Sequence, residues 1–455
     1  MLFQKDLNST IIYQNCTMDK LIKMILVEWK EKNIPIVIPR EINLQDYLNM
    51  GINKVIILNG FRRVGKTYIL YGLANELLKY NSREEVVHIN FEDERIPLKT
   101  EFLSKLLPIA NEIFNKKIKY LFLDELHNIP NWGKWLRRIY DNQNMKIIVS
   151  GSSSRMSGEE IPTELRGRFL EIKIFPLSFR EFLKFKKLNF DFKILDYSDR
   201  EKPLILKALR EYLTYGGLPE AVLIDENKKF ELVQSYYSTV IKRDIIERYN
   251  IKNKESLKAL LKLLLDSKEY SISKSYNNLK SLGYKIGKST LQKYIFYIEN
   301  SYFAFSLPIF SYKIKDQMQY PKKIYFIDNA FINSISTRFL NNFGRLYENI
   351  VAVELKRKKK ECYYWKNAEK EEVDFVIKNN SKINQLVQVC YDVNDPDTKK
   401  REVKALLKAS KDLKCNNLLV ISQDYFGEES LEWFGIKRKI KFMPLWRWLL
   451  ENKKA

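Results

Sequence analysis

The chain has 455 residues, of which 45% are hydrophobic and 13% aromatic, so it is too long for one ordinary core and too apolar for a disordered protein. Its 79 Lys and Arg against 56 Asp and Glu leave a net charge of +23. Such an excess attracts polyanions, of which nucleic acid is the usual one, although a Lys-rich proteome would give the same excess without that partner.

The number and spacing of the cysteines and histidines argue against several kinds of metal, disulfide and catalytic site. The four cysteines lie far apart without a Cys-x-x-Cys pair, which favours free thiols in a reducing compartment over a disulfide framework or a zinc site. With only His88 and His127, a histidine-based metal centre or triad is nearly excluded. The start of the chain lacks the pattern of a signal peptide, and no apolar run is long enough to cross a bilayer. We therefore expect a soluble, cytoplasmic protein without a membrane partner.

The first part of the chain predicts an α/β domain. Residues 1–45 are expected to form a helical lead-in, and from residue 46 to 175 short apolar runs alternate with amphipathic stretches. Near-continuous apolar runs of this length suit parallel strands that are buried on both faces of a sheet. Five such runs, expected to be strands, lie at 54–59, 86–91, 119–124, 146–151 and 168–175.

The remainder of the chain predicts three further parts. Residues 176–250 are mostly helical. Residues 251–330 hold three short helical patterns followed by two strand-like runs, which is the order of a winged helix. Residues 331–455 begin with a helix at about 344–357 and continue with three short strands, so we expect a second, smaller α/β unit there.

A phosphate-binding loop follows the first predicted strand. The stretch "GFRRVGKT" at 60–67 matches G-x-x-x-x-G-K-[ST] at every fixed position, between a buried strand and an amphipathic helix. The glycines let the backbone N–H groups point at phosphate oxygens, next to a helix N-terminus that attracts anions. Lys66 is expected to reach the β- and γ-phosphates of ATP, and the Thr67 hydroxyl to ligate Mg²⁺. The residues predicted to bind the nucleotide here are Gly60, Phe61, Arg62, Arg63, Val64, Gly65, Lys66 and Thr67.

The two arginines inside the loop have a second interpretation. Arg62 and Arg63 could contact the phosphates or the domain that follows, and the sequence does not choose between these.

An acidic pair ends the third predicted strand. In "YLFLDEL" at 120–126, Asp124 follows four apolar residues and is placed to hold the Mg²⁺ shell. Glu125 comes directly after it, and a carboxylate there can polarise the attacking water. The alternative is an exposed acidic turn, but the phosphate loop upstream favours a catalytic pair.

Two more candidates lie after the later strands. Ser152, in "SGSSS" at 150–154, could sense the γ-phosphate, although a serine-rich turn needs no such role. Arg166 and Arg168, in "LRGRF", could complete the site of a neighbouring subunit as arginine fingers, and Arg168 is the one predicted to be catalytic. The alternative is a solvated turn.

These motifs, with "FPLSFREF" at 175–182 and "YGGLPE" at 215–220, follow in an order that resembles the archaeal-type AAA-related ATPases with a C-terminal domain of unknown function. The resemblance extends from about residue 40 to 410. It implies a P-loop ATPase core, a helical lid, a winged helix, and a terminal domain similar to PD-(D/E)xK nucleases. The family also resembles signalling ATPases that act as nucleotide-driven switches.

The resemblance raises the question of nuclease activity. Such nucleases hold Mg²⁺ with an acid on a helix, an Asp on a strand and a Glu-x-Lys on the next strand. Glu348 and Asp374 fit the first two positions, but Gln388 and Cys390 stand where the Glu and the Lys should be. Gln is a weaker Mg²⁺ ligand than a carboxylate, and Cys cannot replace an ammonium. A nuclease-like shell that binds nucleic acid without cutting fits better, although a lysine from elsewhere could swing in.

Two basic segments offer contacts to nucleic acid. The run "KRKKK" at 356–360 suits a phosphate backbone, and it equally suits a helix C-terminus, where lysines favour the dipole. The predicted helix at 288–300 carries Lys288, Gln292 and Lys293 off its apolar face, so it could enter a major groove. Winged helices also serve as protein-docking modules.

Three functions follow from the sequence. The first is a Mg²⁺-dependent ATPase that acts as a nucleotide-driven switch or remodeller on nucleic acid. The second is an ATP-regulated, metal-dependent DNA endonuclease, and the third is a non-enzymatic adaptor with structural ATP. A homo-oligomer or a protein partner is compatible with all three.

Overall fold

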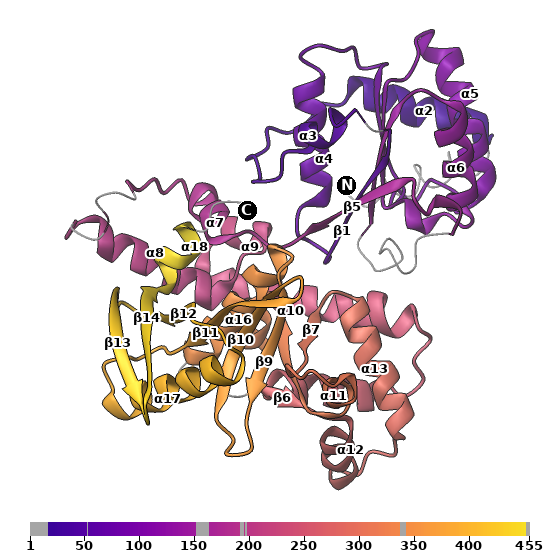
Figure 1. The fold of residues 1–455 in the computed structure, drawn as a ribbon. Helices are drawn as coiled ribbons and strands as arrows, with labels where there is room; N and C mark the ends of the chain where they lie inside the picture. Colours follow the sequence, from indigo (N-terminus) through magenta and orange to yellow (C-terminus); the bar gives the residue numbers. More distant parts are fainter. Residues whose placement is uncertain are drawn as a thin grey trace. The chain divides into compact units, whose positions relative to one another are not determined.

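The computed structural model describes residues 17–51, 53–151, 163–191, 195, 198–336 and 343–451. The chain divides into two compact units, Met1–Ile174 and Phe175–Ala455 (Figure 1). Within the described residues, no helix combines the length and the apolar character that a membrane crossing requires. The finer predicted boundaries, at residues 45, 250 and 330, stay predictions.

A five-stranded parallel sheet forms the centre of the first unit. Its order is β2-β3-β4-β1-β5, so the strand before the phosphate loop (β1) and the strand before the acidic pair (β3) both border β4. All pairings are parallel, as the buried apolar runs predict. This is the parallel α/β core expected of a P-loop NTPase. The strands are β1 Val55–Gly60, β2 Val86–Asn90, β3 Tyr120–Asp124, β4 Lys146–Gly151 and β5 Phe169–Ile174.

The register of this sheet fixes where a site can form. Ile56 of β1 and Phe122 of β3 both pair with Ile148 of β4, and the three strands end within two residues of one another beyond this position. In parallel sheets ligands bind at the carboxyl ends of the strands. Gly60 and Asp124 therefore lie at the same edge, two strands apart.

Helices cover both faces of the sheet (Figure 1). The predicted lead-in does not stand apart from the core, because Ile22, Leu26 and Trp29 of its helix are buried within it. The Trp29 indole also donates to the carbonyl of Val86 in β2, 2.7 Å away. The helices are α2 Met18–Glu31, α3 Leu44–Leu48, α4 Lys66–Leu77, α5 Thr100–Phe114 and α6 Trp132–Asn142, with 3₁₀ turns η1 Leu126–Asn128 and η3 Thr163–Leu165.

The second unit begins with a helical segment, as predicted for residues 176–250. Its first helix starts with a capping box, in which the Ser178 hydroxyl accepts from the Glu181 N–H and the Glu181 carboxylate accepts from the Ser178 N–H. The elements are α7 Phe179–Phe185, α8 Glu201–Tyr215, α9 Pro219–Leu223, α10 Glu226–Thr239 and the π-helix η4 Val240–Glu247.

Three helices and a small antiparallel sheet follow. Leu257, Leu260, Leu261 and Leu264 are all buried and lie on one face of the first of these helices. A two-residue strand, β6, was not predicted; it lies beside β8, giving the sheet order β6-β8-β7. The elements are α11 Lys254–Leu265, β6 Glu269–Tyr270, α12 Ile272–Ser281, α13 Lys288–Asn300, β7 Ala304–Leu307, α14 Ile314–Gln319 and β8 Lys322–Phe326.

The last part of the second unit contains a six-stranded mixed sheet with the order β13-β14-β12-β11-β10-β9. The first helix and three strands match the prediction, but α17, α18 and the strands after residue 390 were missed. The helices are α15 Asn329–Ile335, α16 Phe343–Arg357, α17 Pro396–Asp412 and α18 Leu445–Glu451. The strands are β9 Glu361–Lys366, β10 Glu372–Asn379, β11 Lys382–Val389, β12 Leu418–Ser422, β13 Gly427–Trp433 and β14 Ile436–Pro444.

Candidate nucleotide site and a buried lysine cluster

The phosphate loop curls between β1 and α4. Gly65 has φ 92° and forms the N-cap of α4, a backbone conformation in which a side chain is strained. At Gly60 an added Cβ would lie 2.2 Å from the carbonyl oxygen of Ile174, at the end of the neighbouring strand β5. Both glycines are therefore required by the backbone, which places the N-terminus of α4 at the carboxyl edge of the sheet.

Lys66 is buried at this edge, with 5% of its surface exposed. Its ammonium donates to the carbonyl oxygens of Gly60 (3.2 Å) and Phe61 (3.1 Å) and lies 3.9 Å from Oε1 of Glu125. The cation is thus held inside the loop by neutral carbonyl groups, next to the residues that begin the helix.

Asp124 receives hydrogen bonds on both carboxylate oxygens. The Thr67 hydroxyl donates to Oδ2 at 2.7 Å, and the hydroxyl of Ser150 donates to Oδ1. Burial would raise the pKa of Asp124, but His88, whose Nε2 lies 3.8 Å from Oδ2, and these hydroxyls lower it below its usual value. Hydroxyl and carboxylate oxygens are the ligands that Mg²⁺ prefers, so Thr67 and Asp124 fit the ion.

Glu125 lies one residue beyond the strand in a left-handed conformation, with φ 55°. Burial raises the pKa of its carboxyl to about 7, against the lowering effect of Lys66. Nδ1 of His127 lies 3.3 Å from Oε2 of Glu125. The backbone N–H of Glu125 donates to the Ser150 hydroxyl at 3.2 Å. A buried carboxylate with a raised pKa is the kind of group that can accept a proton near neutral pH.

The other residues predicted to bind the nucleotide differ in their exposure and contacts. Arg62 forms an ion pair with Glu92 (3.0 Å), and Arg63, with φ 67°, is exposed. Phe61 and Val64 are buried under the loop. Ser152 lies outside the described residues.

Arg168 lies at the opposite edge of the sheet from the phosphate loop. It precedes β5, and its carbonyl accepts from the N–H of Val55 at the start of β1 (2.9 Å). Its guanidinium pairs with Asp141 (3.3 Å), and Arg166 nearby is exposed. Since β1 spans six residues, roughly 20 Å, Arg168 does not reach the phosphate loop of its own sheet.

Two residues that bear on the site were not identified in the sequence. The guanidinium of Arg40 donates to the carbonyl of Val64 at 2.8 Å, which braces the loop from 24 positions upstream. Ser150 stands in the same "SGSSS" run as Ser152, and the level ends of β3 and β4 place it beside Asp124. The register between β3 and β4, which the sequence does not give, is what places Ser150 beside Asp124.

The predicted nuclease residues in the second unit also meet, but around a lysine. The ammonium of Lys323, from β8, lies 2.8 Å from Glu348 of α16 and 2.7 Å from Asp374 of β10. Gln388 accepts the Asp374 N–H (3.2 Å), and burial raises the pKa of Cys390 to about 12. Burial would lower the pKa of Lys323, yet the carboxylates raise it well above its usual value. Among the described residues, no group of three or more His, Cys, Asp or Glu side chains is arranged to hold a metal ion.

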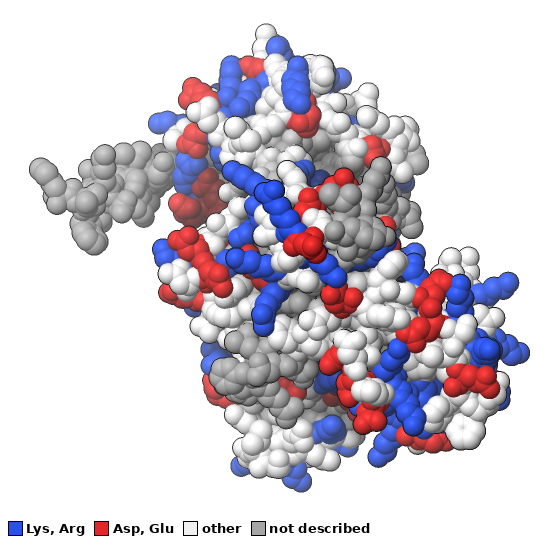
Figure 2. Space-filling view, turned by 90° about the vertical axis from the view of Figure 1, so that its left-hand side faces the viewer, with Lys and Arg blue, Asp and Glu red and all other residues white. Residues whose placement is uncertain are grey.

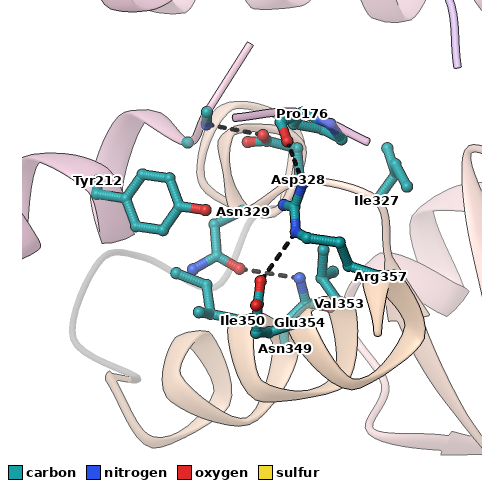
Figure 3. Close-up of a pocket in the computed structure, with 12 residues that line it drawn as sticks. Pro176, Tyr212, Ile327, Asp328, Asn329, Asn349, Ile350, Val353, Glu354 and Arg357 are labelled. Carbon is teal, nitrogen blue, oxygen red and sulfur yellow. Dashed lines mark hydrogen bonds and ion pairs between the residues drawn. The ribbon is translucent and has the colours of Figure 1, made fainter. Parts of the chain in front are cut away.

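A second buried polar network lies around Asp328, where β8 ends (Figure 3). Its carboxylate accepts from the N–H groups of Gly217 (2.8 Å) and Ala330 (2.9 Å). A Cβ at Gly216, which has φ 74°, would lie 1.5 Å from Asp328, so the "YGGLPE" glycines are needed for this approach. Arg357 joins the network from α16 by donating to the carbonyl of Pro176 at 2.8 Å.

Comparison with known proteins gives three matches to family models. An AAA domain covers residues 52–183, a domain of unknown function (DUF8612) covers 206–341, and another (DUF4143) covers 343–447. The uncharacterized protein MJ1544 of Methanocaldococcus jannaschii is 38% identical over 459 residues, covering 99% of this chain and 96% of that protein.

The chain belongs to the same family as MJ1544. It is therefore an AAA-related P-loop ATPase.

Other relatives are more distant. An uncharacterized protein of Haemophilus influenzae is 27% identical over 362 residues, covering 78% of this chain and 87% of that protein. The replication factor C large subunit of Thermococcus kodakarensis is 32% identical over 132 residues, covering 29% of this chain and 24% of that protein. A Walker-type ATPase of Pyrococcus abyssi has a TM-score of 0.41 at 14% identity, over 64% of this chain and 93% of that structure; a likeness this weak carries no argument.

Proposed function

We propose that this AAA-related ATPase hydrolyses ATP with Mg²⁺ and acts as a nucleotide-driven switch or remodeller on nucleic acid. The observation that carries the proposal is the meeting of Lys66, Thr67, Asp124 and Glu125 at one edge of the sheet. The first three are the groups that hold a nucleotide's phosphates and its metal, and the fourth is a proton acceptor.

Each residue has a distinct task in this proposal. Lys66 exchanges its carbonyl partners for the β- and γ-phosphates, and charge-assisted bonds are about twice as strong as neutral ones. Thr67 and Asp124 hold Mg²⁺, which when bound neutralises charge on the phosphate oxygens. Glu125 orients the attacking water and takes its proton.

The contact with nucleic acid is assigned to the three-helix module, which we propose to be a winged helix. Its elements run helix, strand, helix, helix and hairpin, which is the order expected of that fold. Lys288, Gln292 and Lys293 are exposed on α13. The β7–β8 loop adds Tyr312, 80% exposed, beside the exposed Lys313, a pairing suited to base stacking and phosphate contact.

Other observations bear on the partner. Basic and acidic side chains are mixed over the face that Figure 2 shows, so net charge alone does not mark a nucleic-acid surface there. The partial match to a replication factor subunit supports a nucleic-acid partner.

The C-terminal domain is proposed as a nuclease-like shell without cutting activity. The run α16-β9-β10-β11-α17-β12, with β12 parallel to β11, is compatible with a PD-(D/E)xK core. An endonuclease remains the second candidate because Glu348 and Asp374 do meet. The neutral Gln388 and the Lys323 ammonium between the two acids disfavour it.

The test is ATP hydrolysis with single-stranded DNA, duplex DNA or RNA, measured between about 50 and 200 mM salt. We expect turnover that nucleic acid stimulates at low salt, with stimulation falling steeply as salt rises, because phosphate contacts release counterions. Absence of turnover, with nucleic-acid affinity independent of salt, supports the adaptor instead. Nicking of plasmid with Mg²⁺ or Mn²⁺ that Asp374→Ala abolishes supports the endonuclease.

We also propose that Arg168 acts as an arginine finger in an oligomer. Arg137 offers a matched control because it pairs with the same carboxylate, Asp141, at 3.5 Å. Arg168→Ala should lower the rate of ATP hydrolysis, while Arg137→Ala leaves it unchanged. The wild-type rate of hydrolysis per chain should rise with protein concentration, as the oligomer forms. Equal rates for both variants exclude the finger.

A further inference from the structure

The chain's only two histidines both lie beside the acidic pair at the candidate nucleotide site. Nε2 of His88 is 3.8 Å from Oδ2 of Asp124. Nδ1 of His127 is 3.3 Å from Oε2 of Glu125, and the side chains of this second pair are each 8% exposed. The closer of the two contacts is therefore buried, and it is made to the residue proposed as proton acceptor.

The short turn that carries His127 is fixed by hydrogen bonds. His127 lies in the 3₁₀ turn η1, and the backbone N–H of the next residue, Asn128, donates to the carbonyl of Glu125 at 3.1 Å. The side-chain amide of Asn128 donates to the carbonyl of Phe91 at 3.2 Å, which fastens the turn to the residue after β2. Because the backbone is held in this way, the imidazole has a defined position beside the carboxylate.

The Glu125 carboxylate lies between two nitrogen groups. Its Oε1 is 3.9 Å from Nζ of Lys66, and its Oε2 faces Nδ1 of His127. In the proposed function, the Lys66 ammonium exchanges its carbonyl partners for the phosphates of ATP, so its attraction for Oε1 weakens when the nucleotide binds. His127 stays beside Oε2 in that state, because its own turn holds it.

We propose that His127 is a positioning residue, whose Nδ1–H donates to Oε2 of Glu125 and holds that carboxylate toward the attacking water. A general base must lie within hydrogen-bond reach of the proton it accepts, so a carboxylate that can rotate away is a poorer base. The imidazole acts through Glu125 and is assigned no contact with ATP or Mg²⁺. The inference rests on the proposed function, since it concerns the part of Glu125 in hydrolysis.

Two substitutions distinguish the two ring nitrogens of His127. An Asn side chain places an amide N–H near the position of Nδ1, and a Gln side chain places one near that of Nε2. We expect His127→Asn to keep most of the wild-type kcat for ATP hydrolysis, and His127→Gln to lose on the order of 10- to 100-fold, because small misplacements of a reacting group cost that much. KM should stay unchanged in both. A wild-type kcat in His127→Gln, or equal losses in the two variants, overturns the proposal.

Two controls separate positioning from damage to the turn. Asn128→Ala removes the neighbouring side chain and its bond to Phe91, so it should lower the melting temperature and leave kcat at the wild-type value. In the Glu125→Gln background, His127→Gln should cause no further loss, because a residue that acts through a carboxylate has no effect once that carboxylate is gone. A kcat loss in Asn128→Ala as large as that of His127→Gln, or additive losses in the double variant, contradicts the assignment.

A measurement without nucleotide tests the contact itself. In protein labelled with ¹³C-histidine, NMR should show one ring signal for each of the two histidines, and the signal missing from His127→Asn belongs to His127. Glu125→Gln removes the anionic oxygen, so we expect it to shift the His127 signal further than that of His88. An unmoved His127 signal overturns the inference.

The outcomes also separate this inference from the proposed function. If the wild type does not hydrolyse ATP, the proposed function fails, and the role of His127 fails with it. If the wild type hydrolyses ATP and His127→Gln does so at the same rate, only the role of His127 is excluded.

Discussion

The nucleotide site and the Lys323 cluster use the same residue types in opposite ways. At the nucleotide site, the Lys66 ammonium is hydrogen-bonded to two loop carbonyls and lies 3.9 Å from the Glu125 carboxylate oxygen. In the second unit, the Lys323 ammonium makes three ion pairs of 2.7 to 2.8 Å, with Glu348, Glu372 and Asp374. Both lysines are buried beside acids, and short ion pairs neutralise the charge of Lys323.

The difference lies in the backbone that carries each lysine. Lys66 follows a glycine-bent loop at a helix N-terminus, so N–H groups and ammonium can serve one external anion. Lys323 is in a strand whose ladder fixes it against β7, where it pairs with Leu307. The comparison indicates that Lys323 acts as a structural cation because carboxylates surround it.

The largest predicted effect tests whether Glu125 is the proton acceptor of the candidate nucleotide site. Glu125→Gln should lower kcat for ATP hydrolysis by about 10²–10⁴-fold, because general base catalysis contributes that much. ATP affinity should persist, since Lys66 and Thr67 are unchanged. Steady-state hydrolysis and nucleotide binding measure the two quantities separately.

Glu76 gives the matched control, since it is an exposed glutamate of the first unit that pairs only with Lys79 at 2.8 Å among the ion pairs described. Glu76→Gln should hydrolyse ATP at the wild-type rate. Wild-type turnover by Glu125→Gln would remove the residue from the mechanism.

The second prediction concerns Lys66, which we propose exchanges its two carbonyl partners for phosphates of ATP. Lys66→Ala removes hydrogen bonds to a charged ligand, worth about 3 kcal/mol, so ATP affinity should fall on the order of 100-fold. Titration calorimetry with ATP and Mg²⁺ measures the change. Lys79→Ala, at an exposed position just after α4, should leave the affinity intact, and equal losses in both variants would contradict the assignment.

The residues of the candidate nucleotide site could be selected from the sequence because their spacing is local. The spacing of Gly60, Gly65, Lys66 and Thr67 is set by one loop, and the five apolar runs became β1 to β5 almost residue for residue. Parallel strands then bring Asp124 to the same edge without further information. Ser150 and Arg40 were missed because their roles depend on register and on a long-range contact.

The Lys323 cluster could not be predicted in this way. Lys323 is 25 residues from Glu348 and 51 from Asp374, and no spacing rule joins a strand of one sheet to an acid on a helix and an acid in a second sheet. The sequence did identify both acids, and it showed that Gln388 and Cys390 stand where a nuclease would have Glu and Lys. The late strands were missed although "GEESLEWFGIKRKIKF" alternates in burial along β13 and β14, around a turn at Phe434 and Gly435 with φ 44° and 74°.

The smallest predicted effect extends the comparison to Asp328, a buried acid without a short ion pair among the described contacts. Burial raises the pKa of Asp328 from 3.8 to about 6, while the N–H groups of Ala330 and Gly217 and the charge of Arg357 lower it. The folded state therefore binds the proton more tightly than the unfolded state does. Its stabilising contribution is complete below the unfolded pKa and is lost as the pH rises through about 6.

We expect this loss to amount to about 2 kcal/mol of unfolding free energy between pH 4 and 6, measured by urea denaturation of the wild type. Asp328→Asn cannot ionise, so its unfolding free energy should lack that share of the pH dependence, whatever its absolute stability. The slope is the informative quantity because Asn also loses one of the two accepted N–H bonds. Identical slopes for wild type and Asp328→Asn would mean that Arg357 and the two N–H groups compensate the buried charge fully, which would place Asp328 with Lys323 among the neutralised groups.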